Sequence, residues 1–299
     1  MRLLLLLLLA LTSGCDLCWP RGGGIGTCAE PADDDDSGDD DDSGDDDDSG
    51  DDDDSVPDCL APRVRPGAFE AVDGYGYGWV GSDSVDPPTF CWFTQEDGVE
   101  VETDNLSSAG ASVTNDRIEW DVVWYGQTAE VVRIDVNGVL HFDYFPVVNA
   151  FNQCFAPQHE LPPVAALWDN LDMLADGAGS IWHGVVGPVG QRIAVAWWQD
   201  LERVSDGQRV SFQVHLHEAT GHVEVHYLQV ESPQFESDLG RGATVGVLVD
   251  DEGADDPGLW IGCNQPVLRN AYSIAYWPPS ESSTESAGSA SSQESSPKP

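Results

Sequence analysis

Apolar and polar residues alternate along most of the second half of the chain. From residue 118 onward the apolar positions recur with a period of two rather than 3.6, and no window of helical length has a convincing amphipathic face. Gly, Pro, Asp and Asn separate the alternating runs. We expect β-strands at 118–124, 130–135, 138–144, 164–168, 180–186, 192–198, 209–217, 222–230, 243–249 and 272–277. About ten short strands predict an all-β fold, either an antiparallel β-sandwich or a partly closed barrel.

Residues 60–115 are less regular. A run of alternating glycines and aromatic residues at 74–79 and the cluster Cys91-Trp92-Phe93 are expected to add edge strands to the same core.

One hairpin can be registered from the sequence alone. A four-residue loop at 218–221, with Gly221 in the left-handed conformation, places apolar residues opposite each other on one face. The predicted pairs are Leu216 with Val223, Val214 with Val225 and Phe212 with Tyr227. A three-residue loop would set histidines opposite valines, so the apolar pattern selects the longer loop.

The opposite face of this hairpin suggests a metal site. There His217 lies across from His222, His215 across from Glu224, and Gln213 across from His226. Side chains paired across strands are separated by about 5 Å, so His217, His222 and a third ligand, His215 or Glu224, could surround a zinc ion. We favour the interpretation that the histidines fill the solvent-facing side of the hairpin and bind metal only adventitiously, with the zinc site as the alternative.

Other candidate chemistry is limited to two groups of carboxylates. Asp169 and Asp172, or the Asp-Asp-Glu run at 250–252, are the residue types of a glycosidase pair. Aspartates that cap turns after core strands explain both groups equally well. No GxSxG motif occurs, and the Gly-rich run at 22–26 lacks the lysine of a phosphate-binding loop. We therefore expect a protein that is not an enzyme, with a hydrolase or carbohydrate-active domain as the alternative.

The charge of the chain excludes several partners. The formal net charge is -42, and residues 56–279 alone hold 33 acidic residues against 9 arginines. Such a surface cannot neutralise a run of phosphates, which excludes nucleic-acid binding and electrostatic attachment to anionic lipid.

Two segments cannot contribute to a core. Residues 33–55 repeat blocks of four aspartates with Ser-Gly joints, and these blocks hold 16 of the 54 acidic residues. Mutual repulsion predicts a disordered, extended stalk. Calcium is a conceivable ligand, but the alternation of an EF-hand loop is absent. Residues 280–299 are rich in Ser and Glu and are also expected to be disordered.

The start of the chain resembles a lipoprotein signal. Arg2 is followed by nine apolar residues, which suits a secretory leader and is too short to span a bilayer. The sequence Thr12-Ser13-Gly14-Cys15 then resembles the bacterial lipobox, although Thr12 stands where leucine is preferred. The resemblance implies acylation of Cys15 and a stable membrane anchor. A cleaved leader and a soluble secreted product is the alternative.

The remaining cysteines predict disulfides. They are even in number, as expected in an oxidising compartment: Cys18, Cys28, Cys59, Cys91, Cys154 and Cys263. Cys18 and Cys28 bracket a short Gly-rich loop and are expected to pair. The other four allow three connectivities, of which we favour Cys59 with Cys263 and Cys91 with Cys154.

Several motifs together resemble the nidogen-like extracellular module and its bacterial relatives. The resemblance rests on VNGVLHF at 136–142 and LPPVAALWDNLD at 161–172, and continues through 193–199, 212–227, 243–247 and 271–275. It implies an all-β, non-enzymatic domain of cell-surface and secreted proteins that contacts other proteins or matrix. The chain departs from the pattern at Ala166-Leu167, where the family tends to have Pro-Phe, and at His215 and His217, where it tends to have apolar or aromatic residues.

The sequence thus predicts five segments. These are a lipoprotein signal (1–14), a Cys-bounded segment (15–32), the acidic stalk (33–55), a β-sandwich domain (56–279) and a disordered tail (280–299). We expect a lipid-anchored protein of the bacterial cell envelope that displays an interaction or adhesion module for a protein or glycan. We expect no cofactor, with zinc or calcium as the alternatives.

Overall fold

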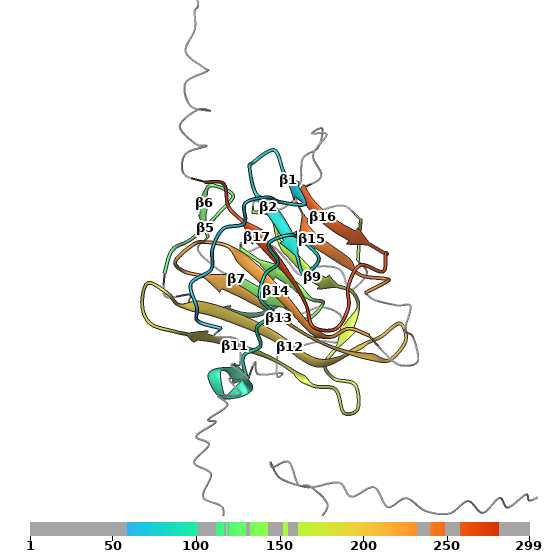
Figure 1. Cartoon of the computed structure of the whole chain (residues 1–299). Helices are drawn as coiled ribbons and strands as arrows, with labels where there is room; N and C mark the ends of the chain where they lie inside the picture. The colour runs from blue at the N-terminus through green and yellow to red at the C-terminus, as the bar shows by residue number, and fades with distance from the viewer. Residues whose placement is uncertain are drawn as a thin grey trace, which may run out of the picture. The chain divides into compact units, whose positions relative to one another are not determined.

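Strands form where β-branched and aromatic residues recur, and every pairing between the described strands is antiparallel. The computed structural model describes residues 59–100, 112–116, 118, 120–129, 132–142, 152–154, 161–231, 240–248 and 258–280. All of these fall within the compact unit Asp54–Pro299. They form a large sheet, a smaller sheet and a separate hairpin (Figure 1).

The large sheet has nine strands. Its order is β1 (Ala71–Val72), β2 (Gly78–Gly81), β17 (Tyr272–Trp277), β14 (Val223–Gln229), β13 (Gln208–His217), β12 (Ile193–Arg203), β11 (Ser180–Val186) and β3 (Val99–Glu100), with β10 (Leu171–Asp172) also paired to β12. A single 3-10 turn, η1 (Gln95–Asp97), precedes β3.

The smaller sheet has six strands in the order β16 (Gly258–Cys263), β15 (Thr244–Leu248), β9 (Val164–Trp168), β8 (Val139–His141), β7 (Val132–Asp135) and β4 (Ser112–Asp116). The separate hairpin consists of β5 (Val122–Trp124) and β6 (Gln127–Ala129).

The two sheets pack face to face around one main core. Trp198 of β12 stacks on Phe212 of β13 with 4.8 Å between ring centroids, and its Nε1 donates to the backbone oxygen of Asp135 in the smaller sheet at 2.8 Å. Tyr227 of β14 donates its hydroxyl to the backbone oxygen of Ala166 at 2.5 Å. Trp198 and Tyr227 thus each remove apolar area from water and also satisfy their one polar side-chain atom across the sandwich.

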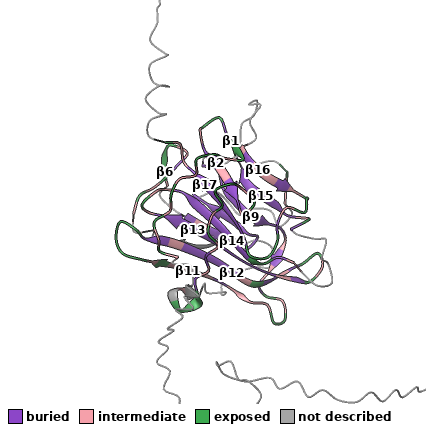
Figure 2. Ribbon diagram, in the orientation of Figure 1, coloured by how far each residue is buried: buried purple, intermediate pink, exposed green. Residues whose placement is uncertain are grey.

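The large sheet is buried on its other face as well. Ile193, Val195 and Trp197 alternate with the core residues of β12 and pack against Cys91 and Phe93. These two residues belong to one of two irregular stretches, 59–66 and 86–93, that flank β1 and β2 and cover this face of the sheet. Strands β13, β14 and β17 are accordingly buried over most of their length (Figure 2). This second cover explains why β12 carries apolar residues on both faces.

The predicted β-sandwich is confirmed, and no closed barrel forms among the described strands. Strands at 164–168, 180–186 and 272–277 have the predicted bounds, and the hairpin pairs Leu216–Val223, Val214–Val225 and Phe212–Tyr227 are confirmed. Gly221 takes the expected left-handed conformation, with φ at 65°.

One expectation about strands was wrong, and β16 was not predicted. Cys91, Trp92 and Phe93 do not form an edge strand: they lie across the face of the large sheet instead of continuing its hydrogen bonding. Strand β16 could not be predicted, because Gly258–Cys263 lacks a clear alternation of apolar and polar residues.

The predicted disulfide connectivity was also wrong. The structure pairs Cys59 with Cys91 and Cys154 with Cys263, not Cys59 with Cys263 and Cys91 with Cys154. The segment between the first two cysteines turns back through β1 and β2, which brings its two ends together over the large sheet. Cys263 ends β16 in the smaller sheet, where Asn152 and Thr244 bring residues 152–154 beside it.

Several predictions fall outside the described residues. These concern the leader and Cys15, the pair Cys18 and Cys28, the acidic stalk, the carboxylates at 250–252 and all but the first residue of the tail.

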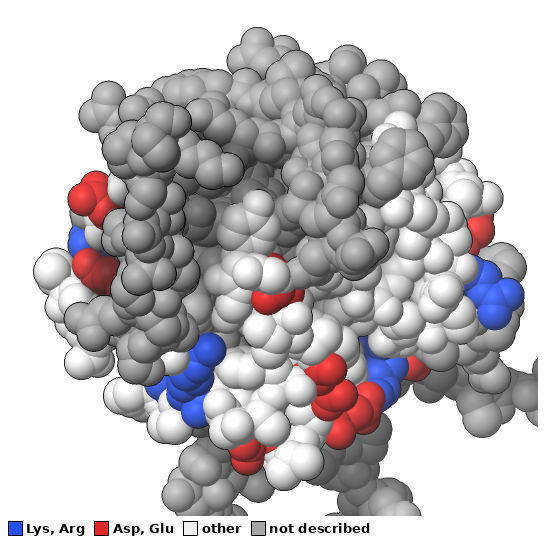
Figure 3. Space-filling view, turned by 90° about the horizontal axis from the view of Figure 1, so that it is seen from above, with Lys and Arg blue, Asp and Glu red and all other residues white. Residues whose placement is uncertain are grey.

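Among the described residues visible in Figure 3, charged side chains lie in small separate groups rather than in a continuous patch of one sign.

A buried histidine and glutamate cluster as the candidate functional site

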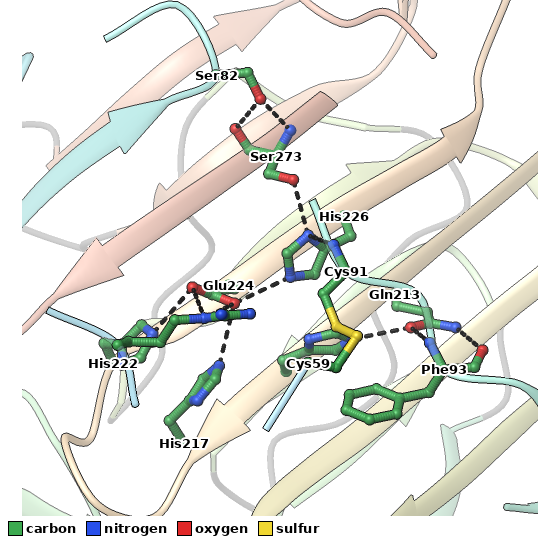
Figure 4. A network of polar contacts seen from close by, with 12 residues as sticks. Cys59, Ser82, Cys91, Phe93, Gln213, His217, His222, Glu224, His226 and Ser273 are labelled. Atoms are coloured by element: carbon green, nitrogen blue, oxygen red, sulfur yellow. Dashed lines mark hydrogen bonds and ion pairs between the residues drawn. A yellow bond between two sulfur atoms is a disulfide. The ribbon is translucent and has the colours of Figure 1, made fainter. Parts of the chain in front are cut away.

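The polar face of the β13–β14 hairpin gathers a cluster of ionisable side chains (Figure 4). The period of two along each strand places His215 and His217 of β13 on the same face as Glu224 and His226 of β14. The predicted pairs His215–Glu224 and Gln213–His226 are confirmed, and the backbone N–H of His217 donates to the oxygen of His222 at 3.1 Å. The register derived from the apolar face therefore fixes this cluster too.

The cluster is buried, which the sequence did not predict. Glu224 is 1% exposed, His217 is 8% exposed, and His215, His222 and His226 are fully buried. The expectation that these histidines fill a solvent-facing surface was wrong, because residues 59–66 and 86–93 cover this face of the sheet.

Side chains of the hairpin hold the covering segment through its backbone. Gln213 acts in both directions: its Oε1 accepts from the N–H of Phe93 at 3.2 Å, and its Nε2 donates to the oxygen of Phe93 at 2.8 Å. The N–H of Cys91 donates to Nδ1 of His226 at 3.3 Å, and Nε1 of Trp197 donates to the Phe93 oxygen at 3.1 Å. The polar face thus satisfies backbone groups of a loop that has no strand partner.

Glu224 lies at the centre of the cluster. Its Oε1 is 3.2 Å from Nε2 of His222, and its Oε2 is 3.2 Å from Nε2 of His217 and 3.1 Å from Nε2 of His226. Arg63, from the covering segment, places its Nε 3.1 Å from Oε1. One carboxylate therefore contacts three imidazoles and one guanidinium.

The remaining contacts restrict which ring nitrogen carries the proton. Nδ1 of His226 accepts from the Cys91 N–H and contacts the hydroxyl of Ser273 at 2.8 Å, so its Nε2 bears the hydrogen that is donated to Glu224. Nε2 of His215 is hydrogen-bonded to Oε1 of Gln213 at 2.9 Å. That oxygen can only accept, so His215 donates there.

Burial controls the ionisation of the cluster. Burial lowers the pKa of His222 to about 4, although its hydrogen bond to Glu224 acts in the opposite direction. The pKa values of His215 and His226 are lowered for the same main reason. Burial alone would raise the pKa of Glu224, but the hydrogen bonds from His217, His222 and His226 outweigh it and hold that pKa well below its usual range. These three histidines with lowered pKa are neutral near pH 7, and Glu224 is ionised.

Aromatic stacking fixes the ring of His222. It lies between His217 and Trp277, with 4.0 Å between ring centroids on each side. Its Nδ1 is in turn in contact with the hydroxyl of Thr220. The orientation of its Nε2 toward Glu224 is therefore held by packing as well as by the hydrogen bond.

Two sets of side chains in the described residues have metal-ligand character. The ligand atoms of His217, His222 and Glu224 lie within 4.8 Å of one another, and so do those of His215, Glu224 and His226. The first set is the predicted pair of histidines with Glu224 as the third ligand. Sequence reasoning placed His226 on this face without including it in the site, and it gave no signal for Arg63, which is 161 positions from Glu224.

The predicted catalytic carboxylates do not converge. Asp169 accepts from the N–H of Asn170 at 2.7 Å and lies 3.9 Å from Nε of Arg203. Asp172 accepts from the N–H of Leu174 at 2.7 Å at the following turn. Each has a local structural contact, and among the described cavities none is lined by both residues.

Comparison with known proteins gives one finding about the family. A family model described as NIDO related matches residues 91–257, which is more than half of the chain. The match includes most of the large sheet and most of the smaller one, but not Arg63 or Cys59. Neither the curated proteins nor the solved structures gave a match. Within the described residues there is no helix with the length and apolar character needed to cross a bilayer.

Proposed function

This chain belongs to the NIDO related family, and on that premise we propose that it is a lipid-anchored protein of the bacterial envelope whose β-sandwich binds a protein or glycan partner. The family and the fold suggest a non-enzymatic module. The two disulfides, Cys59–Cys91 and Cys154–Cys263, indicate an extracellular or envelope location.

The observation that carries the binding role is the separation of the candidate catalytic groups. Asp169 and Asp172 each accept from a backbone N–H at a turn and share none of the described cavities, and the buried cluster around Glu224 lies beneath residues 59–66 and 86–93. Hydrolysis of a glycosidic bond needs two carboxyl groups facing one substrate. Such an arrangement is absent among the described residues, so recognition by the surface of the sandwich is the function that fits best.

A lipid anchor would determine where this binding surface lies in the envelope. Acylation at Cys15 would hold the chain on a membrane, and the acidic stalk at 33–55 would extend the sandwich away from it. We expect globomycin to block maturation, and the mass of the mature N-terminus to include acyl groups on Cys15. A mature N-terminus without acyl groups would instead support a secreted protein.

The binding role is tested with the chain from residue 16 onward on glycan and protein arrays. The expected result is saturable binding to a partner class that survives the double substitution Asp169→Asn and Asp172→Asn. Turnover of an arrayed glycan that these substitutions abolish would contradict the proposal and favour the hydrolase.

A further inference from the structure

We propose that His217, His222 and Glu224 form a binding site for a zinc ion, with Arg63 as a built-in competitor for the carboxylate. The proposal is independent of the partner-binding role. Two imidazoles and one carboxylate are a donor set that suits zinc, whereas calcium and magnesium prefer oxygen ligands alone.

The spacing of the donor atoms fits two ligands of a common ion. His217 Nε2 lies 3.2 Å from Oε2 of Glu224 and His222 Nε2 lies 3.2 Å from Oε1, and one carboxylate oxygen and the two nitrogens all lie within 4.8 Å of one another. Charge-assisted hydrogen bonds between nitrogen and a carboxylate are usually about 2.7–2.9 Å. Tetrahedral bonds of about 2.0–2.1 Å to zinc place neighbouring ligand atoms about 3.3 Å apart. Each of these two nitrogen–oxygen pairs therefore has the spacing of two ligands of one ion.

The hydrogen bonds around the cluster distinguish ligands from supporting residues. When a metal ion binds, the proton of His222 can move from Nε2, where it is donated to Glu224, to Nδ1, where the Thr220 hydroxyl can accept it, which frees the lone pair of Nε2 for the ion. His226 cannot do the same, because its Nδ1 accepts from the Cys91 N–H and its Nε2 donates to Glu224. His226 is therefore a positioning residue that orients the carboxylate, as partners of metal ligands commonly do.

The same reasoning separates the proposed site from the second set of donors. His215 donates from Nε2 to Gln213, and its Nδ1 is buried without a hydrogen-bond partner in the described part of the chain. The set of His215, Glu224 and His226 would need the bonding pattern of His226 to change, because both ring nitrogens of His226 are engaged. His215 thus provides a matched control: it is as buried as His222 and shares the same face of the sheet.

Arg63 sets the condition for metal binding. Its guanidinium neutralises Glu224 when no metal ion is present, and a divalent ion beside it would add two positive charges in a buried place. Zinc must therefore displace Arg63 from the carboxylate. Nη2 of Arg63 has no hydrogen-bond partner among the described residues, and its neighbour Val64 is 85% exposed, so the side chain is held mainly through Nε.

Two cavities provide access to the site. One of about 500 Å³ is lined by Arg63, Glu224 and Trp277, and another of about 200 Å³ by Arg63, His217 and Thr220. Arg63 lies between them. Its displacement would open a route to the three ligands and leave room for water to complete the coordination.

The test is zinc titration of the chain from residue 16 onward, made without an affinity tag and stripped with a chelator. Calorimetry near neutral pH in excess calcium, which occupies the stalk carboxylates, should show one zinc ion per chain. His222→Gln should weaken binding at least about tenfold, His215→Gln should leave it unchanged, and Arg63→Met should tighten it.

Cobalt provides a readout that does not depend on any variant. The wild-type chain loaded with cobalt should show the visible absorption of a tetrahedral site with nitrogen ligands. Circular dichroism checks that each variant is folded. Absence of zinc binding and of the cobalt bands in the wild-type chain would overturn the proposal. So would binding by folded His222→Gln as tight as in the wild type, or binding that only Arg63→Met shows.

Discussion

Arg63 and Glu224 are 161 positions apart in the sequence, yet the Nε of Arg63 lies 3.1 Å from Oε1 of Glu224. The pair joins the irregular N-terminal segment to the centre of the large sheet. Because the carboxylate is buried and also accepts from His226, its removal leaves several donors without an acceptor.

We expect Glu224→Ala to lower the free energy of unfolding by about 3–5 kcal/mol, the usual effect of removing one partner from a buried ion pair. Urea denaturation followed by tryptophan fluorescence measures this directly. Glu96→Ala removes an exposed carboxylate and should change stability by no more than about 0.5 kcal/mol. A loss below about 1 kcal/mol for Glu224→Ala would show that the cluster contributes little to the fold.

The Cys59–Cys91 disulfide should stabilise the domain by lowering the conformational entropy of its unfolded chain. The bond closes a segment with a sequence separation of 32, for which loop entropy gives about 4 kcal/mol. The double substitution Cys59→Ser and Cys91→Ser should lower the free energy of unfolding by up to that amount and should expose residues 60–66 to limited proteolysis. Peptide mapping without reduction should recover Cys59 linked to Cys91, and a peptide joining Cys91 to Cys154 would contradict the structure.

Gly138 should tolerate no side chain. Its φ is 79°, and a Cβ there would lie 2.1 Å from the backbone oxygen of Leu167. Gly126 has a similar φ of 76° with no atom within 4 Å of the same position. Gly138→Ala should therefore cost about 3 kcal/mol or more, and Gly126→Ala only the conformational cost of about 1–2 kcal/mol. Equal losses of thermal stability in the two variants would show that the contact with Leu167 is not the cause.

Glu218 should make stability depend on pH in the acid range. Its side chain accepts from Nη2 of Arg192 at 2.6 Å and from the N–H of Gly190 at 2.7 Å, and these bonds lower its pKa from 4.5 to about 2. A lowered pKa in the folded state means that the stabilisation is fully present above pH 4.5 and is lost as the pH falls toward 2.

The melting temperature of Glu218→Gln should accordingly lie below that of the wild type near neutral pH, and the difference should shrink between pH 4.5 and 2. Arg192→Met removes the other partner of the ion pair and should abolish the same dependence of stability on pH. A difference between Glu218→Gln and the wild type that stays constant over this range would exclude the ion pair as its cause.

The sequence was sufficient to predict the structure wherever a local pattern of residues determines it. The alternation around Phe212 and Tyr227 fixed the hairpin register, and Asn137-Gly138 marked the turn between β7 and β8. The burial of His222 and Glu224 could not be read in this way, because their cover comes from residues more than 120 positions earlier that have no strand pattern. The predicted disulfide pairing was wrong for the same reason, since the pairing depends on how the chain turns between Cys59 and Cys91.

The Cys59–Cys91 bond also determines how a mechanical load would enter the domain. A pull from the N-terminal side reaches Cys59 first and passes through the two sulfur atoms to Cys91. The 31 residues between them, which include β1, β2 and Arg63, are bypassed. A pulling force applied from the N-terminal side would therefore act on Phe93 and its hydrogen bonds to Gln213 and Trp197. The contact between Arg63 and Glu224 would not carry that force.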